Sequence, residues 1–163
     1  MPTTLPKVNR WYNANGTAVE QRTYPEAASQ TFKRGDAVYL ASGKVTVAIT
    51  TGSDVAGATK LLGIALADAS GTTDTGIPVA LASHNLRWVL PVASDDSSDT
   101  TVVTDVGAAY GLRRHGDGKW AINTNEGTDT KVVVTSITPD YAVGETYGLY
   151  ECAFLDAQVD VRV

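Results

Sequence analysis

The stretch KRGDAVYLASGKVTVAITT, residues 33–51, decides the fold class. In its second half, KVTVAIT, apolar and polar residues alternate, so that Val45, Val47 and Ile49 lie on one face. A period of two is typical of a half-buried strand. The first half, DAVYLA, alternates as well, and Gly43 between the halves supplies the positive φ that a tight hairpin requires. The stretch therefore predicts a β-hairpin.

The amino-acid composition favours the same fold class for the whole chain. Its 163 residues are enough for one domain with a core, or for two small barrels that share one. The hydrophobic fraction of 43% is too high for general disorder. Valine and threonine, which suit strands, are abundant, whereas strong helix formers are scarce. We therefore expect an all-β protein.

Charge and cysteine content argue against several classes of protein. The net charge of −5 disfavours a nucleic-acid partner, because binding to phosphate normally requires a basic patch. The single cysteine, Cys152, cannot form an internal disulfide, and its apolar surroundings predict a buried structural thiol. No run approaches about 18 apolar residues, and the N-terminus lacks the apolar core of a signal peptide. We expect a soluble protein, made in the cytoplasm, with no membrane partner.

Composition divides the chain into four parts. Residues 1–32 carry two early prolines and spaced aromatic residues, which predict an N-terminal arm that orders against another surface. The alternative is an edge strand packed on its own domain. Residues 33–92 and 102–163 read as two β units that share one core, because a hairpin alone cannot bury its apolar face. Between them, ASDDSSDTT at 93–101 is polar and acidic and predicts a linker.

Features of the first unit recur in the second in the same order. The similar pairs are Gly35–Leu40 and Gly107–Leu112, Gly43-Lys44 and Gly118-Lys119, and LLGIALADA (61–69) and LYECAFLDA (149–157). Internal similarity of this kind indicates two copies of one supersecondary unit. We therefore predict a small β-barrel or sandwich built from two diverged repeats of a hairpin unit, with an extended N-terminal arm.

The sequence offers no catalytic, cofactor-binding or metal-binding set. Ser83 and His84 are adjacent, so on a strand they would point to opposite faces and could not form a dyad. The G-x-S-x-G elbow of many hydrolases is also missing. We interpret His84 and His115 as turn residues. Since nothing combines a nucleophile, a base and an orienting group, we do not expect an enzyme.

Two motifs have both a binding and a structural interpretation. Asp95, Asp96 and Asp99 carry the oxygen ligands that calcium prefers, but their spacing does not match an EF-hand loop. A solvated acidic linker is the favoured interpretation. The tripeptide RGD at 34–36 matches a cell-adhesion motif, but it leads directly into a strand, where glycine and aspartate serve as turn residues.

The first unit contains a G-D-x-V strand, a strand of pattern hxGhAhxxA (h, apolar) and a glycine-led strand. The residues that fit these motifs are Gly35, Asp36 and Val38; Gly63, Ala65 and Ala69; and Gly76, Ile77 and Val79. With these motifs the chain resembles tailed-phage capsid decoration proteins, also called head cement proteins. The terminal AFLDAQVDVRV resembles the usual end of such chains. The arm at 1–32 and the second unit depart from the family pattern.

The resemblance implies a structural virion protein without enzymatic activity. Such a protein binds the outer surface of a phage capsid and stabilises it by bridging capsomers. The implied partners are the major capsid protein and further copies of the chain, in a homotrimer. The implied location is the outer capsid surface of the virion, after synthesis in the host cytoplasm.

Arginine and aromatic residues on the arm are of the types enriched at interface hot spots. The predicted capsid or subunit contacts are Arg10, Trp11, Tyr12, Arg22 and Tyr24. For Trp11, the alternative is that it covers the end of the barrel.

A different function remains open from the sequence: a carbohydrate- or receptor-binding β module of a head or tail fibre. That function would require exposed aromatic residues on a concave face. Trp88 and Trp120 are the candidates, but both also fit a core.

Overall fold

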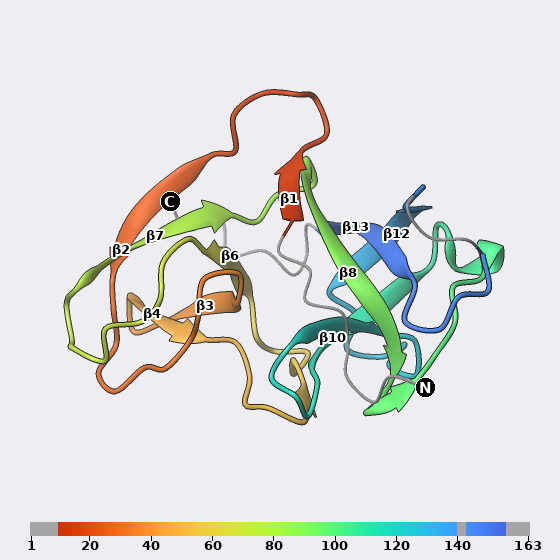
Figure 1. Cartoon of the computed structure of the whole chain (residues 1–163). Coiled ribbons are helices and arrows are strands. Elements are labelled where there is room, and N and C mark those ends of the chain that lie inside the picture. Colours follow the sequence, from red (N-terminus) through yellow and green to blue (C-terminus); the bar gives the residue numbers. More distant parts are fainter. Residues whose placement is uncertain (1–9, 140–142, 156–163) are drawn as a thin grey trace.

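The computed structural model describes residues 10–139 and 143–155, which form two β-sheets (Figure 1). The first sheet has the strand order β2 (Gln21–Pro25), β7 (Gly76–Leu81), β6 (Leu61–Ala65), β3 (Ala37–Ala41) and β4 (Lys44–Val47). Its neighbouring strands are all antiparallel. Within the described residues, the only helix is a short 3-10 helix, η1 (Val103–Asp105). The prediction of an all-β fold is confirmed.

The second sheet closes into a five-stranded barrel. Its strand order is β8 (Leu86–Ser94), β13 (Leu149–Phe154), β12 (Val132–Ile137), β10 (Ala109–Arg114) and β11 (Trp120–Asn123). The parallel pairing of β11 with the end of β8 completes the circle. Three strands are added to it: β1 (Arg10–Asn13), β5 (Ser53–Asp54) and β9 (Ser97–Ser98).

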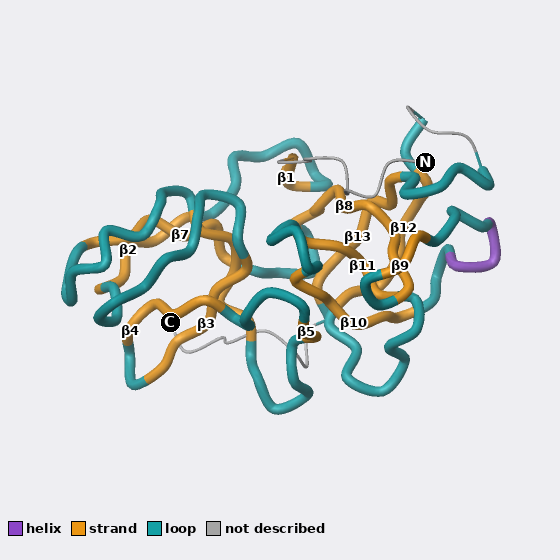
Figure 2. The backbone as a smooth tube through the Cα atoms, turned by 60° about the horizontal axis from the view of Figure 1, so that its bottom comes forward, coloured by secondary structure: helices purple, strands orange, loops and turns teal. Residues whose placement is uncertain are grey.

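The two units have the same strand order, which supports the predicted repeat. When the five strands of each unit are numbered in chain order, both units have the order first, fifth, fourth, second, third. The first unit closes only through a parallel bridge between Glu26 and Val45, whereas the barrel closes through two residue pairs of β8 and β11. The figures show the units side by side along the length of the molecule (Figure 2).

Hydrogen bonds show which parts of the two units correspond. Gly35 and Gly107 both have positive φ, of 96° and 91°, immediately before the first hairpin of their unit. Gly35 N donates to Ala65 O of β6, and Gly107 N donates to Val134 O of β12, both at 2.8 Å. Strand β6 therefore corresponds to β12, and not to β13 as the similarity of LLGIALADA to LYECAFLDA suggested. That similarity consists of small apolar residues, which recur in any buried strand.

The division between the units lies before β8 rather than at the predicted linker. The whole of β8 belongs to the barrel, and β9 pairs back onto its last residues, Ala93 and Ser94. Residues 93–98 of the predicted linker therefore form a hairpin of the barrel. Polarity alone did not reveal this, because the aspartates of the hairpin bind Arg113 and Asn123 of the barrel.

Part of the region predicted as an arm packs on the chain's own sheets. Strand β1 pairs with β8 of the barrel, and β2 pairs with β7 of the first sheet. This arrangement fits the alternative of edge strands on their own domain. Residues 1–9 of the predicted arm lie outside the described residues.

One apolar core joins the units. It contains Leu61 and Ile64 of the first sheet together with the buried faces of β8, β11 and β13. Trp88 contacts Trp120 and Phe154, with ring centroids 5.9 and 6.0 Å apart. A second cluster, around Phe32, fills the interior of the first unit.

Candidate functional site

The predicted contacts on β1 combine one half-buried ring with one exposed ring. Trp11 packs against the shared core, and the guanidinium of Arg34 lies 5.8 Å from its ring centroid. Tyr12 is 39% exposed, and its hydroxyl donates a hydrogen bond to the carboxylate of Glu151. This hydrogen bond raises the pKa of Tyr12. Trp11 therefore covers the barrel, as its alternative interpretation proposed, while Tyr12 is accessible beside exposed Arg10.

The predicted contacts on β2 lie on the other unit. Arg22 is exposed, with its Nη2 3.4 Å from Glu20 Oε1, and Tyr24 packs partly against the cluster around Phe32. Figure 1 shows β1 and β2 on separate sheets. The five predicted residues therefore form two separate surface regions and not one site.

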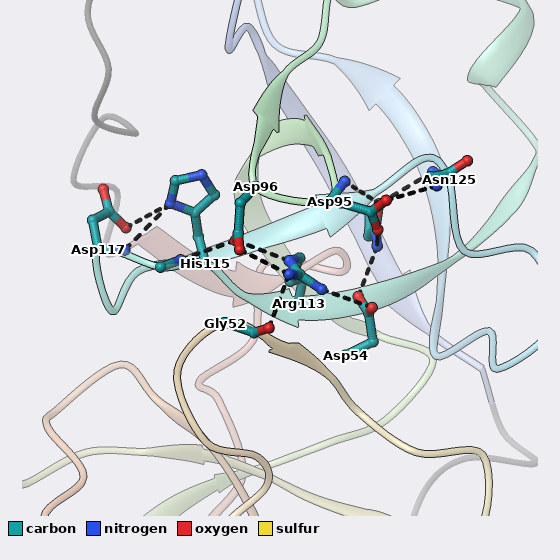
Figure 3. A network of polar contacts seen from close by, with 10 residues as sticks. Gly52, Asp54, Asp95, Asp96, Arg113, His115, Asp117 and Asn125 are labelled. Carbon is teal, nitrogen blue, oxygen red and sulfur yellow. Dashed lines mark hydrogen bonds and ion pairs between the residues drawn. The ribbon is translucent and has the colours of Figure 1, made fainter.

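The most extensive polar cluster surrounds Arg113, which is 8% exposed (Figure 3). Its guanidinium donates two hydrogen bonds to Asp96, at 3.0 and 2.9 Å, one to Asp54 at 2.9 Å and one to Gly52 O at 2.9 Å. The bond from Arg113 lowers the pKa of Asp96. These contacts hold β5 and the β8–β9 hairpin against β10, so the cluster has a structural role.

The other aspartates of the predicted linker are engaged in the same way. Asp95 accepts hydrogen bonds from Asn123 at 3.0 Å and Asn125 at 2.7 Å, which lower its pKa. Asp99 accepts hydrogen bonds from the hydroxyl of Thr124 and the amide of Thr100. The prediction of a linker is therefore wrong, because the segment is part of the barrel, although Asp95 and Asp96 are exposed to solvent as predicted. Among residues 10–139 and 143–155, no group of three or more histidine, cysteine or acidic side chains is arranged to hold a metal ion.

The remaining reactive side chains serve the fold. Ser83 Oγ accepts a hydrogen bond from Leu86 N at 3.2 Å, and His115 Nδ1 lies 3.1 Å from Asp117 in a turn. Burial raises the pKa of the Cys152 thiol, which confirms a buried structural cysteine. Asp36 of the RGD tripeptide is 6% exposed, and it binds side chains of the barrel. A buried aspartate is unavailable to an adhesion receptor.

An exposed apolar surface lies at the end of the barrel, and we call it the valine turn. It consists of Val102, Val103, Val106 and Val143, which are 39%, 64%, 43% and 56% exposed. The two segments are neighbours because Gly144 N donates to Thr101 O at 2.6 Å. The sequence shows two consecutive valines after a polar stretch, but it carries no signal of which side of the chain is buried.

Hydrogen bonds to Tyr150 and Asp105, which are both buried residues, fix the valine turn. The Tyr150 hydroxyl accepts a hydrogen bond from Val102 N at 2.7 Å and donates one to Asp105 at 2.5 Å. Tyr110 donates to the other oxygen of Asp105 at 2.7 Å. Burial and this carboxylate raise the pKa of Tyr110 to about 12. These hydrogen bonds therefore anchor the turn to the barrel, while its four valines are exposed to solvent.

Comparisons with known proteins identify no relative. The chain matches no protein-family model and no curated protein sequence. Within the described residues there is no helix with the length and hydropathy needed to cross a bilayer.

Proposed function

We propose that this chain is a structural protein of a virion, which binds the outer surface of a phage capsid and bridges capsomers. It acts without chemistry on a substrate. Its partners are the major capsid protein and, in a homotrimer, further copies of itself. This function agrees with the family resemblance of the first unit, and with the net negative charge and the all-β fold of the chain.

The valine turn is the observation that carries the proposal. Exposed apolar residues that gather in one place mark interaction surfaces when they are part of a stable structure. Here the fold uses the buried hydroxyl of Tyr150 and the carboxylate of Asp105 to hold the turn in one conformation. A preformed surface loses little conformational entropy on binding, which suits attachment to a repeating lattice.

A bridge also requires a second region of contact. The helix η1, purple in Figure 2, lies at the opposite end of the molecule from β2. The exposed side chains of β2 and the valine turn can therefore face different neighbours. Trp88 and Trp120, the candidates for a carbohydrate site, are buried in the shared core, and so we do not propose that alternative.

Cosedimentation with undecorated heads of the phage that encodes the chain tests the proposal. We expect the wild type to bind, and Val103→Asp to bind about tenfold or more weakly, since a charge is placed in an apolar contact. Ala28→Asp adds the same charge at an exposed position outside the turn and is expected to bind normally. Both variants should melt within about 2 °C of the wild type, because both positions face solvent.

Two results would contradict the proposal. If the wild type fails to sediment with the heads, the chain is not a capsid-binding protein. If Val103→Asp and Ala28→Asp bind equally well, the valine turn does not carry the attachment.

A further inference from the structure

In each unit, the first strand pairs with the fifth strand along one edge, and part of its other edge is not paired within the unit. In the barrel this side of β8 is occupied, because β1 pairs with residues Leu86 to Val89. Strand β13 pairs with the opposite side of the same segment. Because the two units share one strand order, β2 is the counterpart of β8 in the first unit.

Among the described residues, no strand pairs with the corresponding edge of β2. Glu20 O accepts a hydrogen bond from Leu81 N, and Glu26 N donates to Thr75 O, so even-numbered residues of β2 bond to β7. The backbone groups of Gln21 and Thr23 therefore point away from the sheet, since antiparallel pairing alternates. Both residues are exposed, and in the described part of the chain β2 stands at the end of its sheet (Figure 1).

We infer that the outer edge of β2 is a strand-addition site for an extended polypeptide segment of the binding partner. The N–H and C=O groups of Gln21 and Thr23 repeat about every 7 Å, a spacing that an extended backbone matches. Strand β1 on β8 is the same kind of pairing within this molecule. The inference rests on the proposed function, because the segment belongs to the shell to which the chain attaches.

The side chain of Arg22 on β2 indicates which kind of polypeptide segment would bind at this edge. Arg22 lies between the two outward residues, and its ion pair with Glu20 at 3.4 Å is exposed and therefore weak. An acidic side chain on the incoming strand, opposite Arg22, gains a favourable cross-strand pair. If β2 paired with β2 of a second copy so that all four outward groups were satisfied, Arg22 would face Arg22. A second copy is therefore disfavoured, and an acidic segment is favoured.

Proline at position 23 tests the site, because it removes an outward N–H that the β2–β7 ladder does not use. Pro25 already occupies the next outward position, so the strand tolerates this residue. We expect Thr23→Pro to bind undecorated heads about tenfold more weakly than the wild type, since the hydrogen bond donated by the Thr23 amide is lost. Thr23→Val keeps the amide and is the matched control, with normal binding expected.

A charge reversal gives a second test that does not touch the backbone. Arg22→Glu is expected to weaken binding, whereas Arg22→Lys retains it. Because Arg22 is exposed, both variants should melt close to the wild type.

The outcomes separate the site from the function. If the wild type binds and both Thr23→Pro and Arg22→Glu bind equally well, the strand-addition site is wrong and capsid attachment stands. If the wild type does not bind, the proposed function fails and the inference falls with it. If sedimentation velocity shows a wild-type oligomer that Thr23→Pro dissociates, the occupant of β2 is a second copy, which overturns the acidic partner segment.

Discussion

Replacing Asp36 by alanine tests how the two units are held together. Asp36 immediately precedes β3 of the first unit, and its carboxylate accepts three hydrogen bonds. The donors are the amide of Lys33 at 2.9 Å, the indole of Trp120 at 3.0 Å and the guanidinium of Arg114 at 3.1 Å. Two of the three belong to the barrel, so one carboxylate connects the units.

The expected loss follows from the burial of these donors. Trp120 is 5% exposed, and an orphaned buried donor costs about 1–3 kcal/mol. The Arg114 and Asp36 side chains are 14% and 8% exposed, and breaking a buried ion pair on one side costs up to about 3–5 kcal/mol. Since the terms overlap, we expect Asp36→Ala to lower the free energy of unfolding by about 4 kcal/mol. For a chain of this size that is a fall of roughly 8–16 °C in melting temperature.

Urea unfolding at neutral pH, followed by tryptophan fluorescence, measures the loss. The matched control is Asp68→Ala, because Asp68 also accepts a backbone amide at 2.9 Å and a lysine ammonium at 3.1 Å, but its side chain is 56% exposed. An exposed pair contributes at most about 1 kcal/mol. Equal losses for the two variants, or a loss below about 1 kcal/mol for Asp36→Ala, would refute the reasoning from burial.

Three further substitutions test local features of the first unit. Gly63 has a φ of 156°, and an added Cβ would lie 1.9 Å from Ala80 O, so Gly63→Ala should cost about 4 kcal/mol or more in a thermal melt. Gly43→Ala has open space and should cost only about 1–2 kcal/mol for its positive φ. Burial raises the pKa of Glu26, but hydrogen bonds from Ser70 and Gly71 more than offset this and hold it below its ordinary value of 4.5. In urea titrations, the wild type should therefore be more stable than Glu26→Gln at neutral pH. This difference in the free energy of unfolding should be lost as the pH falls below 4.5 toward the lowered pKa. An equal difference at every pH would contradict the reasoning.

Strand positions were the part of the fold that the sequence predicted well. The alternation in KVTVAIT identified β4, and the alternation in DAVYLA identified β3. The alternate residues Val45 and Val47, and Val38 and Leu40, pack in or against the cluster around Phe32, so burial leaves a direct trace in the pattern of residue types. Turn glycines were equally informative, since Gly43 and Gly118 both have positive φ.

Polar segments and surface features were not predictable in the same way. The acidic residues at 93–101 have the composition of a linker, and composition does not distinguish a carboxylate bound to water from one bound to Arg113. The valine turn had no periodicity that separates an exposed valine from a buried one. Trp11 was named for its residue type, and only the packing shows that its ring lies against the core.

The same strand order closes in two different ways, and strand length explains the difference. Strand β8 has nine residues, so its first half can pair with β1 while its second half reaches β11. Strand β2 has five residues, and the chain joins β4 only after β2 has ended, at the bridge between Glu26 and Val45. The buried carboxylate of Glu26 holds this seam by binding the turn at Ser70 and Gly71. Within the described residues, β2 therefore keeps an unpaired outer edge at Gln21 and Thr23, whereas β1 covers the corresponding edge of β8.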